Sequence, residues 1–249
     1  MNTKKDILEI SKAQLMLDYN CKLSDFAKTE NTIVENRLIT GRRLYDSDGC
    51  FFKVVCFGGR AIINTSPEMM VWCEEKLSKC NGAWFFLYSR LREIDNKLQE
   101  FGHEIADVHH YYLPNSNVLE IKPMINVKWY EYNDIFQFKE DNRFEEAFAF
   151  DKNRPDMLAV SALQGNHIMG MAGASADSKN MWQIGIDILP EYRSRGIGTT
   201  LVTLLKNEIL KRGKIPFYGT AESHINSQNI AINSGFFPAW AELHSKSKK

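Results

Sequence analysis

Two arginines and two glycines lie close enough together in the sequence to bind an anion. Residues 193–198 read Arg-Ser-Arg-Gly-Ile-Gly. Glycine leaves the neighbouring backbone amides uncovered, and arginine adds charge-assisted hydrogen bonds to phosphate oxygens. The segment therefore predicts a binding site for a diphosphate. An ordinary strand–helix turn with solvated arginines fits the spacing equally well, because short glycine patterns also arise by chance.

The flanking residues predict a strand before this segment and a helix after it. Residues 182–188 alternate between apolar side chains and polar or small ones, which is the period of a half-buried strand, and Pro190 follows. Apolar residues then recur at helical spacing from Leu201 to Leu210, ahead of Gly213. The first amides of such a helix have no partner within it, and the helix dipole adds partial positive charge there. Both effects favour an anion at the predicted loop.

The same residues resemble a known family. Residues 193–198 match the Gln/Arg-x-x-Gly-x-Gly/Ala signature of the GNAT superfamily of N-acetyltransferases. A second stretch agrees with the family, because a strand predicted over 216–221 precedes a short helical segment that ends in Gly235-Phe236. The resemblance covers roughly residues 129–243. It implies an α/β (α+β) fold with a mixed, mostly antiparallel, splayed sheet flanked by helices, and it implies acetyl-CoA as the cofactor.

The resemblance also implies how acetyl-CoA is held. Backbone groups of Ile188 and Leu189 would pair with the pantetheine amides, and the diphosphate would lie on the amides of residues 195–199. Ser227 and Ala231 would place small side chains beside the pantetheine, although close helix–sheet packing needs small residues equally. The cofactor-binding residues expected from the resemblance are Ile188, Leu189, Arg193, Ser194, Arg195, Gly196, Ile197, Gly198, Thr199, Asn226 and Ser227.

The family generally transfers the acetyl group directly from the thioester to an amine, and a proton donor assists the departing thiolate. Many relatives place a tyrosine for this role in the last helix, where this chain has Ala231. Tyr192 and Tyr218 lie near in the sequence but not at that position. The donor is therefore expected to be Ser227, a water molecule or no group at all.

Three side chains are candidates for the general base. Glu222 and His224 follow the predicted strand at the place where the family's strands open onto the acceptor, and Glu222 ranks first by position. Histidine titrates near neutral pH, although a loop or capping role explains His224 at least as well. Asp187 lies on the polar face of the strand ahead of the loop, where a solvated or ion-paired carboxylate is the commoner interpretation.

The first half of the chain predicts an α+β domain. Two apolar runs around Gly58-Gly59 indicate a hairpin, since both glycines can adopt a positive φ. The expected elements are helices over 7–17, 66–81 and 91–101, and strands over 51–57, 60–64, 84–88 and through 111–112. The turn-rich segment 113–128 predicts the connection, which divides the chain into domains over 1–125 and 126–249.

The first domain has no phosphate loop or catalytic spacing of its own. It would form a wall of the acceptor pocket or an interface in a homodimer. Its layout resembles that of a less-studied bacterial GNAT group, some members of which acetylate amino-bearing antibiotics. Arg42 and Arg43 are expected to be exposed turn residues, with an acidic acceptor as the alternative role.

Composition excludes several classes of protein. Lys plus Arg equals Asp plus Glu at 31 each, so no basic footprint indicates binding to a nucleic acid or a membrane surface. No apolar run approaches a membrane span of about 20 residues, and the polar first residues lack the apolar core of a signal peptide. Five irregularly spaced cysteines, among them Cys21 and Cys80, predict reduced thiols rather than a disulfide framework. A cytoplasmic protein without a metal site is expected.

The sequence thus predicts an acetyl-CoA-dependent N-acetyltransferase whose acceptor is a small-molecule amine bound between the two domains. The absence of a tyrosine at Ala231 leaves a catalytically silent acyl-CoA-binding module as an alternative. A protein N-acetyltransferase, acting on a chain terminus or a lysine, is the third interpretation.

Overall fold

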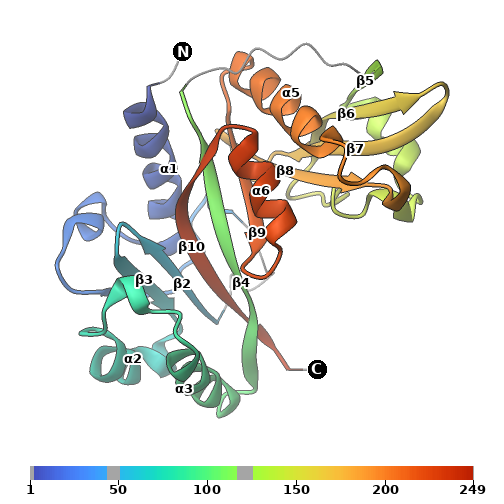
Figure 1. Ribbon diagram of the computed structural model, residues 1–249. Helices are drawn as coiled ribbons and strands as arrows, with labels where there is room; N and C mark the ends of the chain where they lie inside the picture. Colours follow the sequence, from blue (N-terminus) through green and yellow to red (C-terminus); the bar gives the residue numbers. More distant parts are fainter. Residues whose placement is uncertain (1–2, 44–50, 117–125, 249) are drawn as a thin grey trace. The chain divides into compact units, whose positions relative to one another are not determined.

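The computed structural model describes most of the chain, namely residues 3–43, 51–116 and 126–248. The chain folds into two compact units, each assembled from two separate stretches: residues 1–8 with 112–238, and residues 9–111 with 239–249. The chain therefore passes from one unit to the other within long elements, whereas the sequence predicts consecutive domains over 1–125 and 126–249. Figure 1 shows the elements of both units. None of the helices in the described ranges is both long and apolar enough to cross a membrane.

The first unit contains strands in the order β9-β8-β7-β6-β5. Their bounds are β5 Asn126–Glu131, β6 Asp156–Gln164, β7 His167–Ser175, β8 Met181–Ile188 and β9 Ile215–Ala221. Neighbours from β5 to β8 run antiparallel, and β9 runs parallel to β8. This mixed, mostly antiparallel sheet with flanking helices confirms the predicted fold class.

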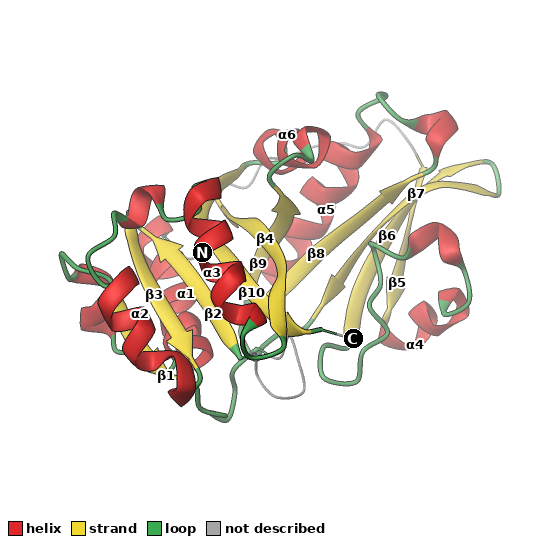
Figure 2. Ribbon diagram, turned by 90° about the horizontal axis from the view of Figure 1, so that it is seen from below, coloured by secondary structure: helices red, strands yellow, loops and turns green. Residues whose placement is uncertain are grey.

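Helices cover both faces of this sheet. On one face, α5 (Ile197–Lys211) contacts β6, β7 and β8, and α6 (Ile225–Asn233) contacts β9 and α5. The other face is covered by α4 (Tyr132–Ile135) and two 3-10 turns, η4 (Phe136–Phe138) and η5 (Asn142–Phe144). Figure 2 shows α6 and α4 on opposite sides of the strands. Because side chains alternate along each strand, one face joins the apolar core under α5 and the other joins a second core of aromatic residues.

The second unit combines helices α1, α2 and α3 with strands in the order β1-β3-β2-β10-β4. Its principal elements are α1 Lys4–Tyr19, β1 Thr32–Glu35, β2 Phe52–Phe57, β3 Arg60–Thr65, α2 Met70–Leu77, α3 Tyr88–Gln99, β4 His103–Pro114 and β10 Phe236–Ser247. Three 3-10 turns lie among them, η1 Leu23–Ala27, η2 Pro67–Met69 and η3 Gly82–Trp84. Strands β2 and β3 form the predicted hairpin, and Gly58 and Gly59 adopt φ angles of 58° and 78° at its turn. The hairpin prediction is therefore confirmed.

One predicted strand is wrong. Residues 84–88 were expected to form a short buried strand, but they close η3 and begin α3. The side chain of Asn81 accepts a hydrogen bond from the amide of Ala83 (2.9 Å), which caps a helical turn in this place. Trp84 is 66% exposed, and Phe85 is buried. The aromatic residues suggested a strand, and a capped turn overrides that preference.

The described cysteines remain unpaired thiols. Cys21, Cys56, Cys73 and Cys80 form no disulfide with one another, and Cys50 lies outside the described residues. Burial raises the pKa of Cys56 and of Cys73 to about 12, so both thiols stay protonated at neutral pH.

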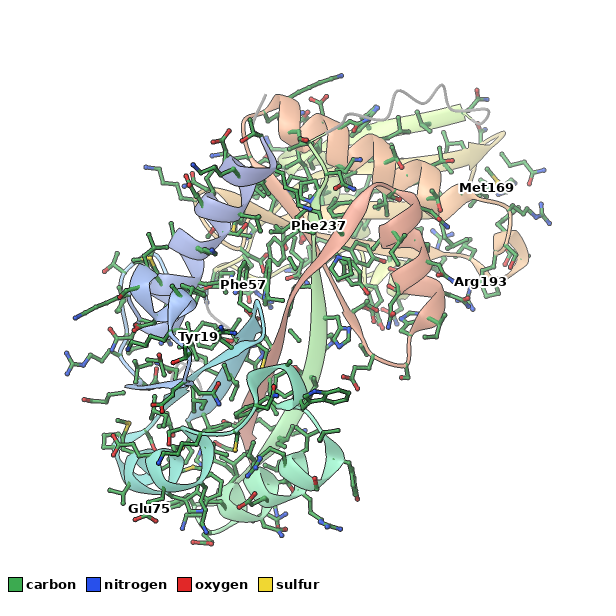
Figure 3. All side chains as sticks on the ribbon, turned by 60° about the vertical axis from the view of Figure 1, so that its left-hand side comes forward. Tyr19, Phe57, Glu75, Met169, Arg193 and Phe237 are labelled. Atoms are coloured by element: carbon green, nitrogen blue, oxygen red, sulfur yellow. The ribbon has the colours of Figure 1, made fainter. Side chains whose placement is uncertain are left out.

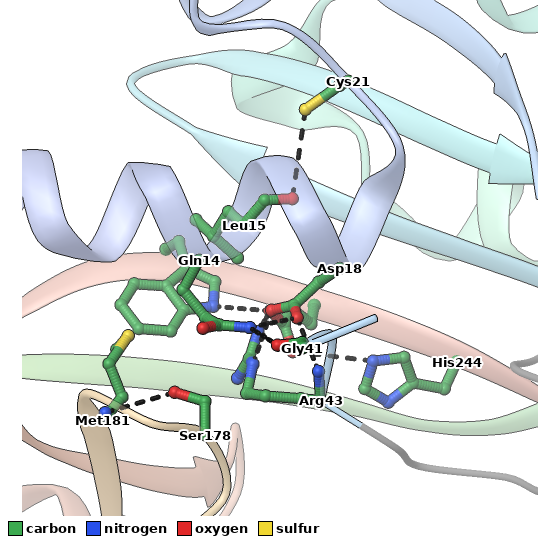
Figure 4. A network of polar contacts seen from close by, with 11 residues as sticks. Gln14, Leu15, Asp18, Cys21, Gly41, Arg43, Ser178, Met181 and His244 are labelled. Atoms are coloured by element: carbon green, nitrogen blue, oxygen red, sulfur yellow. Dashed lines mark hydrogen bonds and ion pairs between the residues drawn. The ribbon is translucent and has the colours of Figure 1, made fainter. Parts of the chain in front are cut away.

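Arg43 is buried, so the expectation that residues 42 and 43 are exposed turn arginines is wrong. Its Nε donates to Asp18 Oδ2 (2.6 Å) and its Nη2 donates to Glu242 Oε1 (2.7 Å). Figure 4 shows Arg43 beside Asp18 in this network. Burial alone would raise the pKa of Glu242, but Arg43 and His244 lower it to about 2. The pairing of Arg43 with a strand 199 positions later explains why local sequence could not reveal it.

Substituting Arg43→Met should therefore destabilise the protein strongly. Removing Arg43 leaves the buried carboxylate of Asp18 without its counter-charge and that of Glu242 with His244 alone, which costs about 3–5 kcal/mol. Arg37→Met is the matched control, because Arg37 pairs with Glu35 at the surface (3.3 Å) and exposed pairs contribute below about 1 kcal/mol. Urea denaturation measures both changes in the free energy of unfolding. Equal, small losses for the two variants would show that the buried network does not stabilise the fold.

Candidate functional site

The loop between β8 and α5 has an unusual backbone. After β8 ends at Ile188, the 3-10 turn η6 (Pro190–Tyr192) leads into residues 193–196. Ser194 and Gly196 both have a positive φ, 61° and 74° respectively. Left-handed residues that alternate with right-handed ones turn successive amides toward a common concavity, which suits an anion. Ser194 holds this conformation although it is not glycine, so the surrounding loop must constrain it.

Consecutive backbone amides in this loop have no acceptor among the residues that the structure describes. Across the described residues, the amides of residues 194–199 donate to no protein atom, and the first donor beyond them is Thr200, whose amide reaches Gly196 O (3.0 Å). These groups comprise the start of α5 and the turn before it. The helix dipole adds partial positive charge at the same place. The arrangement can therefore bind an anion through the main chain alone.

The two glycines of the motif serve different purposes. A Cβ atom placed on Gly196 would meet nothing within 4 Å, so this residue faces open space and is required by its positive φ. A Cβ atom on Gly198 would lie 2.9 Å from the Ile230 Cδ1 atom and 3.6 Å from Ile188 Cγ1. Gly198 therefore allows α6 to pack closely against α5. From the sequence, both glycines were expected to leave the backbone amides accessible to a diphosphate.

The two arginines stabilise the loop through hydrogen bonds to nearby carbonyl groups. Arg193 Nε donates to Ile188 O (3.1 Å), and Arg195 Nη2 donates to Glu191 O (2.9 Å). The guanidinium of Arg195 also lies over the ring of Tyr192, 5.4 Å from its centroid. Figure 3 shows Arg193 near the start of α5. Both side chains are exposed, so their other N–H groups can reach an anion on the adjacent amides.

Strands β8 and β9 pair only at one end. Their register runs from Met181 opposite Ile215 to Ile184 opposite Tyr218, although β8 continues to Ile188 and β9 to Ala221. This divergence matches the splayed sheet that the sequence predicts. Beyond the last pair, each strand presents backbone groups that the other strand does not satisfy.

The alternation along β8 shows which groups these are. The amide of Leu189 donates to Met169 O (3.0 Å), and the carbonyl of Leu189 accepts from Tyr192 (2.9 Å). In an antiparallel pair, alternate residues point their backbone groups to opposite sides, so Ile186 and Ile188 point theirs toward the divergence. The carbonyl of Ile188 accepts from Arg193, as described above. Among the described residues, the backbone N–H and C=O groups of Ile186 and the amide of Ile188 remain available. Leu189 was also expected to bind the cofactor through its backbone, but both of its backbone groups bond within the protein.

A buried pair of hydroxyl groups lies where the strands diverge. Tyr218 Oη and Ser227 Oγ are 2.8 Å apart, and both side chains are buried, as is Ala231 one turn further along α6. Burial raises the pKa of Tyr218 to about 12. From the sequence, Ser227 was expected near the cofactor. Tyr218 was not assigned to the site, because Tyr218 lies on a strand rather than at the position where the family usually has its tyrosine. This pairing depends on how α6 packs against β9, so no local pattern in the sequence indicates it.

This geometry can be compared with known proteins. The model of the acetyltransferase (GNAT) family matches residues 121–236. Residues 121–236 are a GNAT domain. A GCN5-related N-acetyltransferase-like protein from Streptococcus suis 89/1591 is similar in structure, with 12% sequence identity and a TM-score of 0.50, over 96% of this chain and 100% of that one. At this identity the likeness shows the fold alone.

Two further structures are similar over part of the chain. A GNAT-family acetyltransferase structure from Novosphingobium aromaticivorans DSM 12444 has 13% identity and a TM-score of 0.44, over 59% of this chain and 69% of that one. A GCN5-related N-acetyltransferase from Kribbella flavida has 14% identity and a TM-score of 0.45, over 61% of this chain and 62% of that one. The chain matches no curated protein sequence. The family implies acetyl-CoA as the cofactor of the GNAT domain.

A segment of main chain lies directly on the GNAT sheet, opposite α5. A Cβ atom on Gly185 would overlap the carbonyl oxygen of Glu146, and one on Gly173 would overlap that of Ala147. Asp187 Oδ2 accepts hydrogen bonds from the amides of Glu146 and Ala147, each 2.9 Å long. Burial raises the pKa of Asp187, although these two bonds oppose the shift. Asp187 thus fastens this segment, which we call the 144–148 strap, to β8.

The other two candidates for the base lie at the end of β9. Glu222 and His224 are exposed in the turn between β9 and α6, and the carbonyl of Glu222 accepts from Gln228 Nε2 (2.7 Å). His224 directly precedes α6, and its side chain makes no capping bond. Asn226 is exposed in the first turn of α6. The described residues hold no group of three His, Cys, Asp or Glu side chains arranged for a metal ion.

The contrast between Gly185 and Gly198 predicts different tolerance to alanine. In Gly185→Ala the new methyl group meets backbone of the 144–148 strap, which cannot move without breaking the bonds to Asp187, so we expect a loss of about 3 kcal/mol. In Gly198→Ala the methyl group meets the flexible end of Ile230, and helix propensity improves, so the change should stay within about 1 kcal/mol. Urea denaturation compares the two variants. A tolerant Gly185 would mean that the strap does not lie on β8 in solution.

Proposed function

We propose that the GNAT domain binds acetyl-CoA and transfers its acetyl group to the amine of a small molecule by direct attack. The observation that carries this proposal is the run of amides at residues 194–199 without an acceptor in the described protein. A diphosphate supplies oxygen acceptors and negative charge, which suits both the amides and the helix dipole. Open space beside Gly196 leaves room for it.

The remaining contacts to the cofactor follow from the divergence of β8 and β9. The backbone groups of Ile186 and the amide of Ile188 would hold the pantetheine amides, since β9 does not pair with this part of β8. Arg193 and Arg195 would add charge at the diphosphate from the positions in which they brace the loop. Ser227 would lie beside the sulfur end of the pantetheine, at the start of α6.

Bound acetyl-CoA would supply an activated acyl group and a thiol leaving group. The protein contributes by holding the acceptor amine next to the thioester and by accepting the proton that the amine loses. We assign Glu222 as the base, because its exposed carboxylate follows the diverging end of β9. Asp187 is the weaker candidate, since one of its oxygens already accepts two amides of the strap.

A catalytically silent acyl-CoA-binding module is a second candidate function. One observation favours it, namely that fully buried Ala231 stands where many relatives have a tyrosine. A thiol-release screen across aminoglycosides, polyamines and amino acids separates the two functions. Release with any of these amines supports the enzyme, whereas tight binding of acetyl-CoA without release supports the silent module.

Substituting Gly196→Asp should weaken the binding of acetyl-CoA by about tenfold or more relative to Gly196→Asn. Both side chains tolerate a positive φ and enter open space, but only the aspartate places a negative charge beside the diphosphate. Isothermal titration calorimetry measures both dissociation constants. Gly213→Asp is the control for a distant charge, because Gly213 also has a positive φ and open space around it and follows the opposite end of α5. If the wild-type protein does not bind acetyl-CoA, or if the aspartate and asparagine variants bind it alike, the proposed site is wrong.

A further inference from the structure

His244 lies deep in the second unit, between two carboxylates. It belongs to β10, and only 6% of its surface is exposed. Its Nδ1 atom is 3.7 Å from Asp107 Oδ1 on β4, and its Nε2 atom is 3.5 Å from Glu242 Oε2 on β10. Strands β4 and β10 are neighbours in the sheet, and Figure 4 shows His244 in the same network as Arg43. His244 therefore stands between one carboxylate from each of two adjacent strands.

Only the protonated ring of His244 suits both carboxylates. A neutral imidazole has one N–H donor and one nitrogen with a lone pair, so in either tautomer a lone pair faces a carboxylate oxygen. That contact is repulsive, because both atoms carry negative partial charge. The imidazolium has an N–H group on each nitrogen and a positive charge. The position of the two carboxylates thus favours a proton on His244.

The carboxylate of Glu242 is fixed in its orientation toward His244. Its Oε1 atom accepts hydrogen bonds from Arg43 Nη2 (2.7 Å) and from Trp240 Nε1 (2.9 Å). Rotation of the carboxylate would break both bonds inside the protein, where an unsatisfied polar group is costly. The Oε2 atom therefore stays directed at the ring of His244.

The charged groups that reach His244 leave an excess of negative charge. Asp107 approaches from β4 together with His109, whose Nδ1 atom is 3.0 Å from the same oxygen of Asp107. From β2, Lys53 lies directly opposite His244 and contributes one positive charge. Burial by itself lowers the pKa of His244, but the hydrogen bonds and charges of Asp107 and Glu242 raise it overall.

Two neighbouring ion pairs do not offset this excess, since each is neutral in itself. Asp18 of α1 pairs with Arg43 (2.6 Å), and Glu104 of β4 pairs with Lys246 of β10 (3.4 Å). The phenol of Tyr19 also remains uncharged, because burial raises its pKa well above the ordinary value. A proton on His244 is thus the available compensation for the carboxylates that face it.

We propose that His244 is an imidazolium in the folded protein at neutral pH and acts as a pH-sensitive clamp between β4 and β10 in the second unit. The clamp consists of Asp107, His244 and Glu242. Loss of the proton leaves a lone pair against a buried carboxylate, so the two strands are held together less strongly at alkaline pH. The clamp is independent of the proposed function.

Linkage fixes the direction of the pH dependence. Histidine in an unfolded chain titrates near about pH 6.5, and the folded protein holds the proton of His244 more tightly. The stabilisation is therefore fully present below about pH 6.5 and is lost as the pH rises through the pKa of folded His244. Glu242 stays ionised throughout, because its pKa is about 2.

Nitrogen-15 NMR of the imidazole rings tests the clamp on the wild-type protein. The two ring nitrogens have similar chemical shifts in an imidazolium and widely separated ones in a neutral ring, since only the imidazolium is protonated at both. Correlations to the assigned backbone identify His244, so no variant is required. We expect an imidazolium at neutral pH and a titration midpoint above about 6.5. A neutral His244 ring at neutral pH would overturn the clamp.

Two substitutions test whether Asp107 holds this proton. Asp107→Asn preserves the shape of the side chain but removes its charge, so it should lower the titration midpoint of His244. Asp151→Asn is the matched control, because Asp151 pairs with Arg154 in the other unit (3.2 Å) and should leave the midpoint unchanged. If the midpoint is also unchanged in Asp107→Asn, the proposed clamp is wrong.

Urea denaturation measures the consequence for stability. The unfolding equilibrium constant of His244→Gln, divided by that of the wild type, should fall several-fold between about pH 6 and about pH 9, because only the wild type loses the clamp. Lys206, whose pKa burial lowers to about 8, titrates in the same range but is present in both proteins and cancels in the ratio. A ratio that stays constant over this range contradicts the proposal. If His244→Gln does not fold, the midpoint measured by NMR decides.

Discussion

The amides of residues 194–199 must find acceptors outside the segment that carries them, because a helix cannot satisfy its own first donors. In the described ranges no protein atom accepts a hydrogen bond from these amides. The left-handed backbone at Ser194 and Gly196 is part of this arrangement. Arg193 and Arg195 fix the loop by donating to carbonyl groups on either side of it. The remainder of the GNAT domain serves to hold this loop beside the diverging end of β8.

Three glycines show how closely the layers of the GNAT domain must approach. Gly185 and Gly173 allow the main chain of the 144–148 strap to lie on one face of the sheet, and Gly198 allows α6 to pack against α5 on the other. These contacts hold β8 from both faces. The edge of β8 that faces β9 is left unpaired by β9 beyond Ile184.

Local patterns in the sequence were sufficient to predict the elements around the site. The alternation in β8, the loop and α5 follow from periodicity and from the signals at helix ends, which act over a few residues. The aromatic residues that begin at Trp84 led to the wrong prediction of a strand, because the side chain of Asn81 caps a helical turn there. The burial of Arg43 could not be predicted, because its partner Glu242 is distant in the sequence. The hydrogen bond between Tyr218 and Ser227 could not be predicted either, because it depends on how α6 packs against β9.

The proposed function depends on the binding of a coenzyme diphosphate by main-chain donors at the start of α5. Amide chemical shifts from nitrogen-15 NMR test it most directly, because a new hydrogen bond to an anion shifts the resonance of the donating amide. Titration with acetyl-CoA should move the resonances of residues 194–199 in a saturable way, while those of Arg212 and Gly213, at the opposite end of α5, stay in place. If acetyl-CoA binds and the resonances of residues 194–199 do not move, the coenzyme is held elsewhere and this binding mode is contradicted.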